Sequence, residues 1–121
     1  MTEKTTLVIG ASTKPNRFSN IAVRNLVLHR YPVIAVGLRE GIIHGVRIRK
    51  PFPELKNIHT VTLYIGSKKQ TEYYDYILNI HPKRVIFNPG TENVKFEEML
   101  RMHGVEVITG CTLIMLSDGT Y

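Results

Sequence analysis

The sequence predicts an α/β fold in which helices cover both faces of a mainly parallel sheet of about five strands. Short apolar runs typical of buried strands recur along the chain, and segments with one apolar helical face lie between them. Strands that alternate with helices join through right-handed crossovers, which make the strands parallel and place helices on both faces of the sheet. The chain has 121 residues, so we expect one domain over residues 1–121.

The first half of the chain alternates between strand and helix. The continuous apolar run Leu7–Ile9 predicts a strand buried on both faces. Ser19 is a suitable N-cap for a helix over residues 20–30, and a second buried strand follows at Val33–Val36. The stretch 38–57 has no clear period, so we expect a loop with at most one turn of helix.

The middle of the chain continues this order. Residues 60–65 alternate between polar and apolar side chains, which predicts a third strand. Ser67 and Gln70 have the spacing of a capping box, so a helix is expected to begin there and to continue to Ile80.

The last third contains two more predicted strands, Val85–Phe87 and 105–108. Asn93 is placed to cap the helix between them, and Gly104 suits the left-handed position after its last turn. The tail 110–121 is too short to classify. The alternation through the whole chain predicts a single Rossmann-like three-layer domain.

The charge balance favours anionic partners. The chain carries 16 Lys and Arg against 10 Asp and Glu, a net charge of +6. Such a charge suits nucleic acid, anionic lipid or a phosphorylated cofactor. The basic residues are dispersed, and the densest stretch, Arg47–Lys50, is short and interrupted. This dispersion disfavours nucleic acid, and an ordinary solvated basic face explains the charge equally well.

The expected location is cytoplasmic. The longest apolar runs fall far short of a membrane span, and the polar start of the chain does not look like a secretory signal. We therefore expect no membrane partner. Cys111 is the single cysteine, which excludes a disulfide within one chain and any site built from several thiolates.

A ligand crevice is expected where the strands end. In open parallel sheets, ligands bind beyond the carboxyl ends of the strands, at the point where the strand order reverses. The predicted strand ends carry glycine and other small residues, which let a ligand approach the backbone. These ends are Gly10-Ala11-Ser12, Gly37-Leu38-Arg39, Gly66-Ser67-Lys68 and Asn88-Pro89-Gly90.

The turn after the first strand, residues 10–19, contains the parts of a phosphate cradle. It lacks the second and third glycines of the dinucleotide fingerprint G-x-G-x-x-G. It supplies instead hydroxyl groups, two positive charges and the N–H groups that open a helix. The side chains concerned are Ser12, Thr13, Ser19, Lys14 and Arg17. Plain surface charges are the competing interpretation of Lys14 and Arg17.

The end of the second strand helps to choose the ligand. NAD-binding domains place an acidic residue there for the ribose hydroxyl, whereas this chain has Arg39. An arginine suits a phosphomonoester on a ribose, which both NADP and coenzyme A carry. A dehydrogenase also needs a substrate domain, for which the chain has no room. An NADP-binding redox accessory domain and a nucleic-acid-binding basic domain stay open as alternatives.

The chain resembles the small single-domain coenzyme A-binding proteins, which are similar to the nucleotide-binding N-terminal domain of the succinyl-CoA synthetase alpha subunit. The matching stretches are Val8–Ser12 with Lys14-Pro15, Arg17 and Ser19; Tyr31–Val36; Gly45-Val46 before Pro53–Leu55; Arg84–Gly90 with Asn93; and Gly104–Val107 with Cys111. The chain departs from the many members that read Asn-Pro after the second strand, because it has Gly37-Leu38 there.

The resemblance implies a coenzyme A or acyl-CoA ligand and assigns its contacts. Gly10, Ser12, Lys14, Arg17 and Ser19 would hold the diphosphate, and Ala11, Thr13 and Phe18 belong to the same predicted site. Val36, Gly37 and Arg39 would lie against the adenosine and its 3′-phosphate. Gly66, Asn88, Pro89 and Gly90 would line the path of the pantetheine arm.

No catalytic set or metal site is predicted, so the expected function is binding without catalysis. The five histidines are scattered without metal-ligand spacing. His103 falls on an apolar helix stripe and is expected in the core or at its boundary. Cys111 is expected to be a buried structural residue, with a nucleophile or a thiol partner of coenzyme A as the alternative. Tyr73 or Tyr74 is expected to pack on the sheet. A homodimer is plausible because two-fold dimers are the commonest assembly.

Overall fold

A computed structural model describes residues 3–121. It contains one seven-stranded sheet with the order β3-β4-β2-β1-β5-β6-β7. Six strands are parallel, and only β3 runs antiparallel to its neighbour in the described chain. The elements are β1 (Thr6–Ile9), α1 (Phe18–Leu28), β2 (Val33–Val36), β3 (Gly41–Ile43), β4 (Val46–Arg49), β5 (Thr60–Leu63), α2 (Ser67–Gln70), the 3₁₀ helix η1 (Thr71–Tyr73), α3 (Tyr74–Ile80), β6 (Arg84–Phe87), α4 (Val94–Met102), β7 (Glu106–Thr109) and α5 (Thr112–Asp118). The predicted Rossmann-like three-layer fold is confirmed, with more strands than expected.

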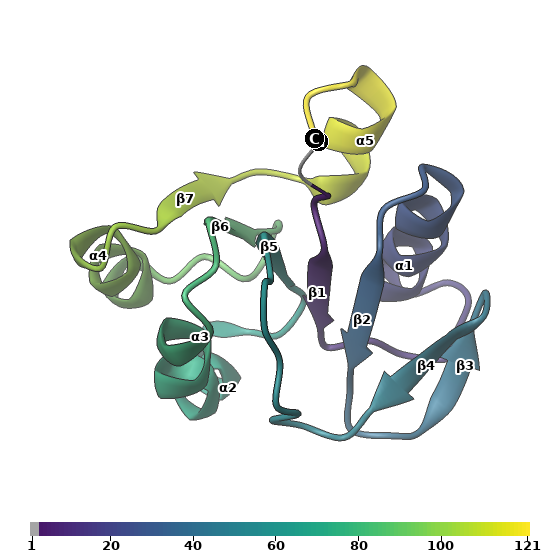
Figure 1. Cartoon of the computed structure of the whole chain (residues 1–121), viewed down its shortest axis with the longest axis horizontal. Coiled ribbons are helices and arrows are strands. Elements are labelled where there is room, and N and C mark those ends of the chain that lie inside the picture. Colours follow the sequence, from purple (N-terminus) through teal and green to yellow (C-terminus); the bar gives the residue numbers. More distant parts are fainter. Residues whose placement is uncertain (1–2) are drawn as a thin grey trace.

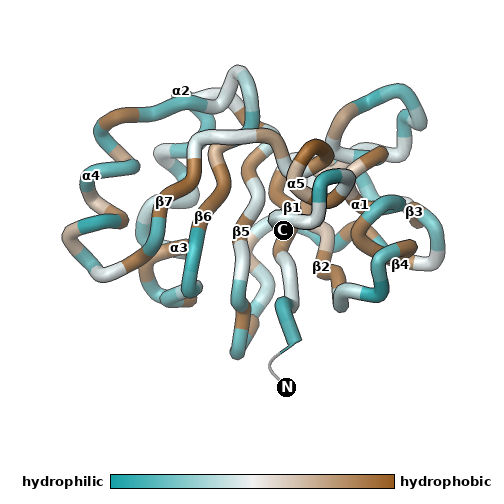
Figure 2. Tube along the Cα trace, turned by 90° about the horizontal axis from the view of Figure 1, so that it is seen from above, coloured by the Kyte–Doolittle hydropathy of each residue, from teal (hydrophilic) through white to brown (hydrophobic). Residues whose placement is uncertain are grey.

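Helices cover both faces of the sheet. Figure 1 shows α1 and α5 together on one side, with α2, α3 and α4 on the other. Alternate strand residues point to opposite faces. Leu7 thus joins the core beneath α3 and α4, whereas Val8 joins the core beneath α1 and α5. Hydrophobic residues follow the central strands in Figure 2, as expected for strands covered on both sides.

The prediction of a loop over residues 38–57 is wrong. This stretch contains the β3–β4 hairpin, which adds two strands to the β2 edge of the sheet. His44 and Gly45 form its tight turn with positive φ values of 47° and 84°. In Val46–Arg49 the apolar and basic residues alternate, and Ile48 packs beneath α1. This alternation is typical of a strand with one buried face, although the basic residues in it also fit a charged loop.

Two predicted helix starts are wrong in detail. Arg17, not Ser19, is the N-cap of α1, because a turn closed by the Arg17 N–H on the Lys14 carbonyl leads directly into the helix. Gly66 is the N-cap of α2, and no capping bond from Ser67 exists within the described residues. The predicted single helix is divided into α2, η1 and α3.

Other local predictions are confirmed. The Oδ1 atom of Asn93 accepts a hydrogen bond of 3.1 Å from the Phe96 N–H and caps α4. Gly104 adopts the left-handed conformation after that helix, with φ of 77°. The tail that could not be classified folds as α5. No helix of residues 3–121 has the length and apolar character needed to cross a membrane.

Candidate functional site

The strand order reverses beside β1. β1 lies between β2, which follows it in sequence, and β5, which begins the other half of the sheet. The carboxyl ends of β1, β2 and β5 therefore meet at one edge, where ligands bind in folds of this type. The turn from β1 to α1 and the loop from β5 to α2 both start there. The first turn predicted as a phosphate cradle is thus located at the switch point.

Two glycines at this edge are required by contacts within the chain. Gly10 has a φ of 96°, and a Cβ atom on it would lie 2.9 Å from Ile65 Cγ2 and 3.0 Å from the Tyr64 carbonyl oxygen. A Cβ atom on Gly37 would lie 2.3 Å from the Ala11 carbonyl oxygen. These glycines let three chain segments pack together. This reason differs from the expected one, which was access for a ligand.

The predicted residues fall into two groups by exposure. Those with exposed side chains or backbone are Thr13, Lys14, Arg17, Phe18, Arg39, Gly66, Pro89 and Gly90. Gly10 and Ser12 are half-buried, and the buried ones are Ala11, Ser19, Val36, Gly37 and Asn88. The exposed group lies on the loops after β1, β2, β5 and β6, with Phe18 at the first position of α1, so the fold brings these residues to one edge of the sheet.

The first turn has a defined internal structure. The N–H groups of Gly10 and Ala11 both donate to the Val36 carbonyl oxygen at 2.9 Å, which ties the end of β1 to the end of β2. The Oγ atom of Ser12 accepts a hydrogen bond of 3.2 Å from the Lys14 N–H. A side-chain cap for the first turn of α1 is absent among the described residues. The leading N–H groups of that helix thus remain available at its positive end.

The electrostatic environment of this turn suits an anion. Lys14 and Arg17 are exposed, and the sequence has no acidic residue between Glu3 and Glu40. Neither cation takes part in an ion pair within residues 3–121, where Arg101 and Glu97 form the one pair, at 3.9 Å. Two unpaired cations beside free N–H groups can bind a phosphate through charge-assisted hydrogen bonds. The residues present therefore fit a diphosphate group.

Asn88, a predicted ligand contact, is buried in a network of hydrogen bonds. Its Nδ2 atom donates to Thr62 Oγ1 at 2.6 Å and to the Leu63 carbonyl oxygen at 2.8 Å. Its Oδ1 atom accepts from the Thr112 N–H at 2.9 Å. The Asn88 side chain is 1% exposed. All its polar atoms have partners, so the amide holds β5, β6 and α5 together.

Gln70, which the sequence marked only as part of a capping box, organises the rest of this edge. Gln70 is fully buried and donates to the carbonyl oxygens of Ile65, at 3.0 Å, and Thr91, at 2.7 Å. Its Oε1 atom accepts from Asn93 Nδ2 at 2.9 Å. The sequence could have indicated this role of Gln70, because a polar residue at a helix position that faces the core needs hydrogen-bond partners there. Asn20 and Arg24 of α1 also bind the first turn, and no pattern in the sequence marks them.

The cysteine, histidine and tyrosine residues considered in the sequence differ in how deeply they are buried. Cys111 is half-buried rather than fully buried. His103 is exposed, so its predicted place in the core or at its boundary is wrong; its ring Nδ1 lies 2.8 Å from the Met99 carbonyl oxygen of its own helix. Tyr73 is buried against the sheet, and Tyr74 stacks on Phe96 with ring centres 4.3 Å apart. No three His, Cys, Asp or Glu residues gather as a metal site in the described part of the chain.

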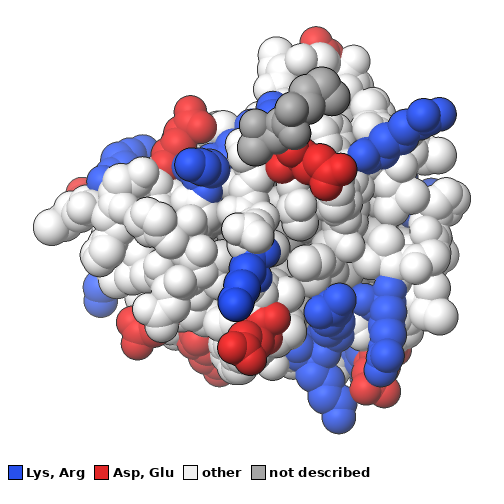
Figure 3. All heavy atoms as spheres, in the orientation of Figure 1, with Lys and Arg blue, Asp and Glu red and all other residues white. Residues whose placement is uncertain are grey.

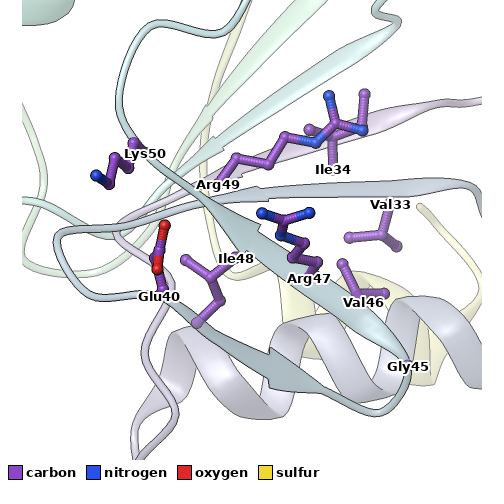
Figure 4. Close-up of a pocket in the computed structure, with 9 residues that line it drawn as sticks. All are labelled: Val33, Ile34, Glu40, Gly45, Val46, Arg47, Ile48, Arg49 and Lys50. Atoms are coloured by element: carbon purple, nitrogen blue, oxygen red, sulfur yellow. The ribbon is translucent and has the colours of Figure 1, made fainter.

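A basic hollow of about 670 Å³ lies away from the switch point, over β2 and β4. Arg47 and Arg49 point to the same side of β4 in its lining, with Ile34 of β2 beside them (Figure 4). Lys and Arg side chains also gather near β3 and β4 in Figure 3. The hollow does not include the first turn, so these two basic regions are separate.

A doubly wound sheet with a basic, donor-rich turn at its switch point places the chain among the Rossmann-like α/β domains. The family model of the CoA binding domain matches residues 4–117, and the chain belongs to that family. The family predicted from the sequence is therefore confirmed. None of the curated proteins matches the chain.

Solved structures agree with the fold. A crystal structure described as an uncharacterized protein is 45% identical, with a TM-score of 0.95 and 98% of each chain covered. A hypothetical protein from Pyrococcus horikoshii OT3 is 23% identical, with a TM-score of 0.85, and the match covers 98% of this chain and 84% of that one. A dinucleotide-forming acetyl-coenzyme A synthetase 1 from Ca. Korarchaeum cryptofilum, in complex with phosphate and ADP, is 18% identical, with a TM-score of 0.70. This chain, 88% covered, corresponds to 25% of that synthetase.

Proposed function

We propose that the protein binds coenzyme A or an acyl-CoA and holds the diphosphate of this ligand at the turn between β1 and α1. The observation that carries the proposal is the pair of exposed cations, Lys14 and Arg17, beside the uncapped start of α1 at the switch point. Membership of the CoA-binding domain family supports the choice of ligand.

The rest of the ligand is assigned by position. Arg39 follows β2 and is exposed, so its guanidinium is available to the 3′-phosphate of the adenosine. Val36 is fully buried, and its contribution would be limited to shaping the wall of the site. Around Gly66 and Gly90, a Cβ atom would meet no other atom within 4 Å among the described residues. That open space would accommodate the pantetheine arm.

The phosphate contacts have a direct test. Replacement of Lys14 or Arg17 by alanine is expected to weaken coenzyme A binding by roughly 1.5–3 kcal/mol, because each removes a charge-assisted hydrogen bond. Isothermal titration calorimetry measures the loss, with Lys95→Ala on the exposed surface of α4 as the matched control. If both variants at the turn bind like the wild type, the diphosphate is held elsewhere.

The same titrations separate the alternatives. Dephospho-CoA should bind less tightly than coenzyme A if Arg39 contacts the 3′-phosphate, and Arg39→Ala should remove that difference. An NADP-binding accessory domain would prefer NADP in competition. A nucleic-acid-binding domain would bind a single-stranded RNA oligonucleotide with an affinity that falls steeply as salt is added.

The proposed role is binding without catalysis, in a cytoplasmic setting, and a homodimer is the assembly to be tested. Acetyl-CoA incubated with the protein should release no more free thiol than acetyl-CoA in buffer, as measured with a thiol reagent. Faster release that the Cys111→Ser variant abolishes would contradict the non-catalytic role. The assembly is measured by light scattering with and without coenzyme A.

A further inference from the structure

We propose that Asn20 and Arg24 are positioning residues that hold the first turn in its anion-binding shape before the ligand arrives. The inference rests on the proposed function, because the turn they hold is the one assigned to the diphosphate. It concerns two side chains of α1 that point back to the turn from which their helix starts.

The two side chains form a continuous brace. Asn20 Nδ2 donates to the Ser12 carbonyl oxygen at 2.8 Å, and Arg24 Nη2 donates to the Pro15 carbonyl oxygen at 2.8 Å. Arg24 Nε also donates to Asn20 Oδ1 at 2.8 Å, which links the two contacts. Residues four apart lie on the same helical face, so α1 presents both side chains to the turn. Asn20 is only 4% exposed, which protects its bond from water.

The brace determines which way the N–H groups of the turn point. In a trans peptide unit, the carbonyl of one residue and the N–H of the next point in opposite directions. No peptide bond of the described chain is cis. Because Ser12 and Pro15 direct their carbonyls toward the side chains of α1, the N–H groups of Thr13 and Asn16 point away from those side chains.

The other N–H groups of the turn are used internally. The Lys14 N–H donates to Ser12 Oγ, and the Arg17 N–H donates to the Lys14 carbonyl oxygen at 3.1 Å. The N–H groups of Thr13 and Asn16 have no hydrogen-bond partner within residues 3–121. The turn thus offers two oriented, unused donors at the residues that directly precede the exposed Lys14 and Arg17. Such donors bind an anion without first reorganising.

Arg24 acts through its geometry rather than its charge. Its guanidinium spans two acceptors on different segments at once, which the planar fork of arginine permits and the single ammonium of lysine does not. Without the brace, the turn between Ser12 and Arg17 would keep only the bonds of the Lys14 and Arg17 N–H groups and would be less ordered in the free protein. The additional ordering on binding would subtract from the affinity.

The test compares Arg24→Lys and Arg24→Met with the control Lys95→Met on α4. Coenzyme A binding is measured by calorimetry at several salt concentrations, and the ¹⁵N order parameters of Thr13 and Asn16 are measured in the free protein. We expect both Arg24 variants to bind about tenfold more weakly, with the order parameters of the two amides falling from rigid values near 0.85 to below about 0.6. The salt dependence should stay that of the wild type in Arg24→Lys, because the charge is kept.

The opposite results overturn the inference. If Arg24→Lys binds like the wild type, charge and not geometry is the contribution of Arg24. If binding weakens while the order parameters stay high, Arg24 contacts the ligand instead of positioning the turn. If the wild-type protein does not bind coenzyme A, the proposed function fails; the brace is then judged by the order parameters alone, and unchanged values in both Arg24 variants reject it.

Discussion

The turn after β1 and the turn after β6 look alike in the sequence but are used differently by the fold. Both follow a buried strand, contain small and polar residues, and lead into a helix. In the turn after β1, the backbone carbonyls of Ser12 and Pro15 are bound by α1, and the cationic side chains face solvent. In the turn after β6, Asn88 and Asn93 are themselves buried and fully bonded.

The difference separates two uses of polar residues at strand ends. A turn held through its carbonyls keeps its charged side chains and the N–H groups of Thr13 and Asn16 free for a ligand. In a turn held through its side chains, those groups are already bonded within the fold. The exposed backbone after β6 adds no free donor, because Pro89 has no N–H and the Gly90 N–H donates to Glu92 Oε1 at 2.9 Å. The direction of the hydrogen bonds, more than the residue types, thus indicates which turn is adapted to binding.

The largest expected effect tests the buried turn. Asn88→Ala should lower the free energy of unfolding by about 3 kcal/mol or more, because it leaves the Thr112 N–H and the Leu63 carbonyl oxygen buried without partners. Urea unfolding measures the loss. Asn16→Ala in the exposed turn is the matched control and should stay within about 0.5 kcal/mol of the wild type. Equal, small effects in both variants would remove the distinction between the two turns.

The next effect tests how tightly the first turn is packed. Gly37→Ala places a Cβ atom 2.3 Å from the Ala11 carbonyl oxygen, so the backbone must move. We expect a loss of about 2 kcal/mol in the free energy of unfolding, together with weaker coenzyme A binding because Ala11 leads into the turn. Gly66→Ala, whose Cβ atom would meet no described atom within 4 Å, should leave stability nearly unchanged. A destabilised Gly37→Ala variant that binds normally would show that the turn is independent of β2.

The smallest effect concerns Tyr64, which follows β5 between the two turns. Burial raises the pKa of Tyr64 to about 12, above the value near 10 of a free tyrosine. The folded chain therefore holds the proton more tightly, so stability is full below pH 10 and falls as the pH rises from 10 toward 12.

Tyr64→Phe should reduce this alkaline loss of stability, as followed by urea unfolding at several pH values. The hydroxyl of Tyr64 is buried without a hydrogen-bond partner in the described chain, so its removal should change the free energy of unfolding little at pH 7. Burial also raises the pKa of Tyr76 to about 12, and its hydroxyl, unlike that of Tyr64, donates to the Pro53 carbonyl oxygen. Tyr76→Phe should therefore reduce the alkaline loss as well, but destabilise the protein at pH 7. If the stability of Tyr64→Phe falls with rising pH in the same way as that of the wild type, the titration of Tyr64 does not cause the alkaline loss.

Local patterns in the sequence were sufficient for most of the fold. The apolar runs at Leu7–Ile9 and Val33–Val36, and the cap at Asn93, depend on neighbours within a few residues, and all were predicted. The exposed cations of the first turn were recognised for the same reason. The β3–β4 hairpin was missed because its alternation is short and its strands become visible only when they join the β2 edge.

The sequence by itself determined the alternation of elements and the family, because periodicity and short motifs act over a few residues. Only the tertiary structure decided which polar residues serve the fold and which stay free for a ligand. The bonds of Asn88 reach 25 residues back to Leu63 and 24 forward to Thr112. The brace from Arg24 crosses from a helix to the turn before it. No local pattern specifies such partners, because they are set by the packing of segments that are distant in the chain.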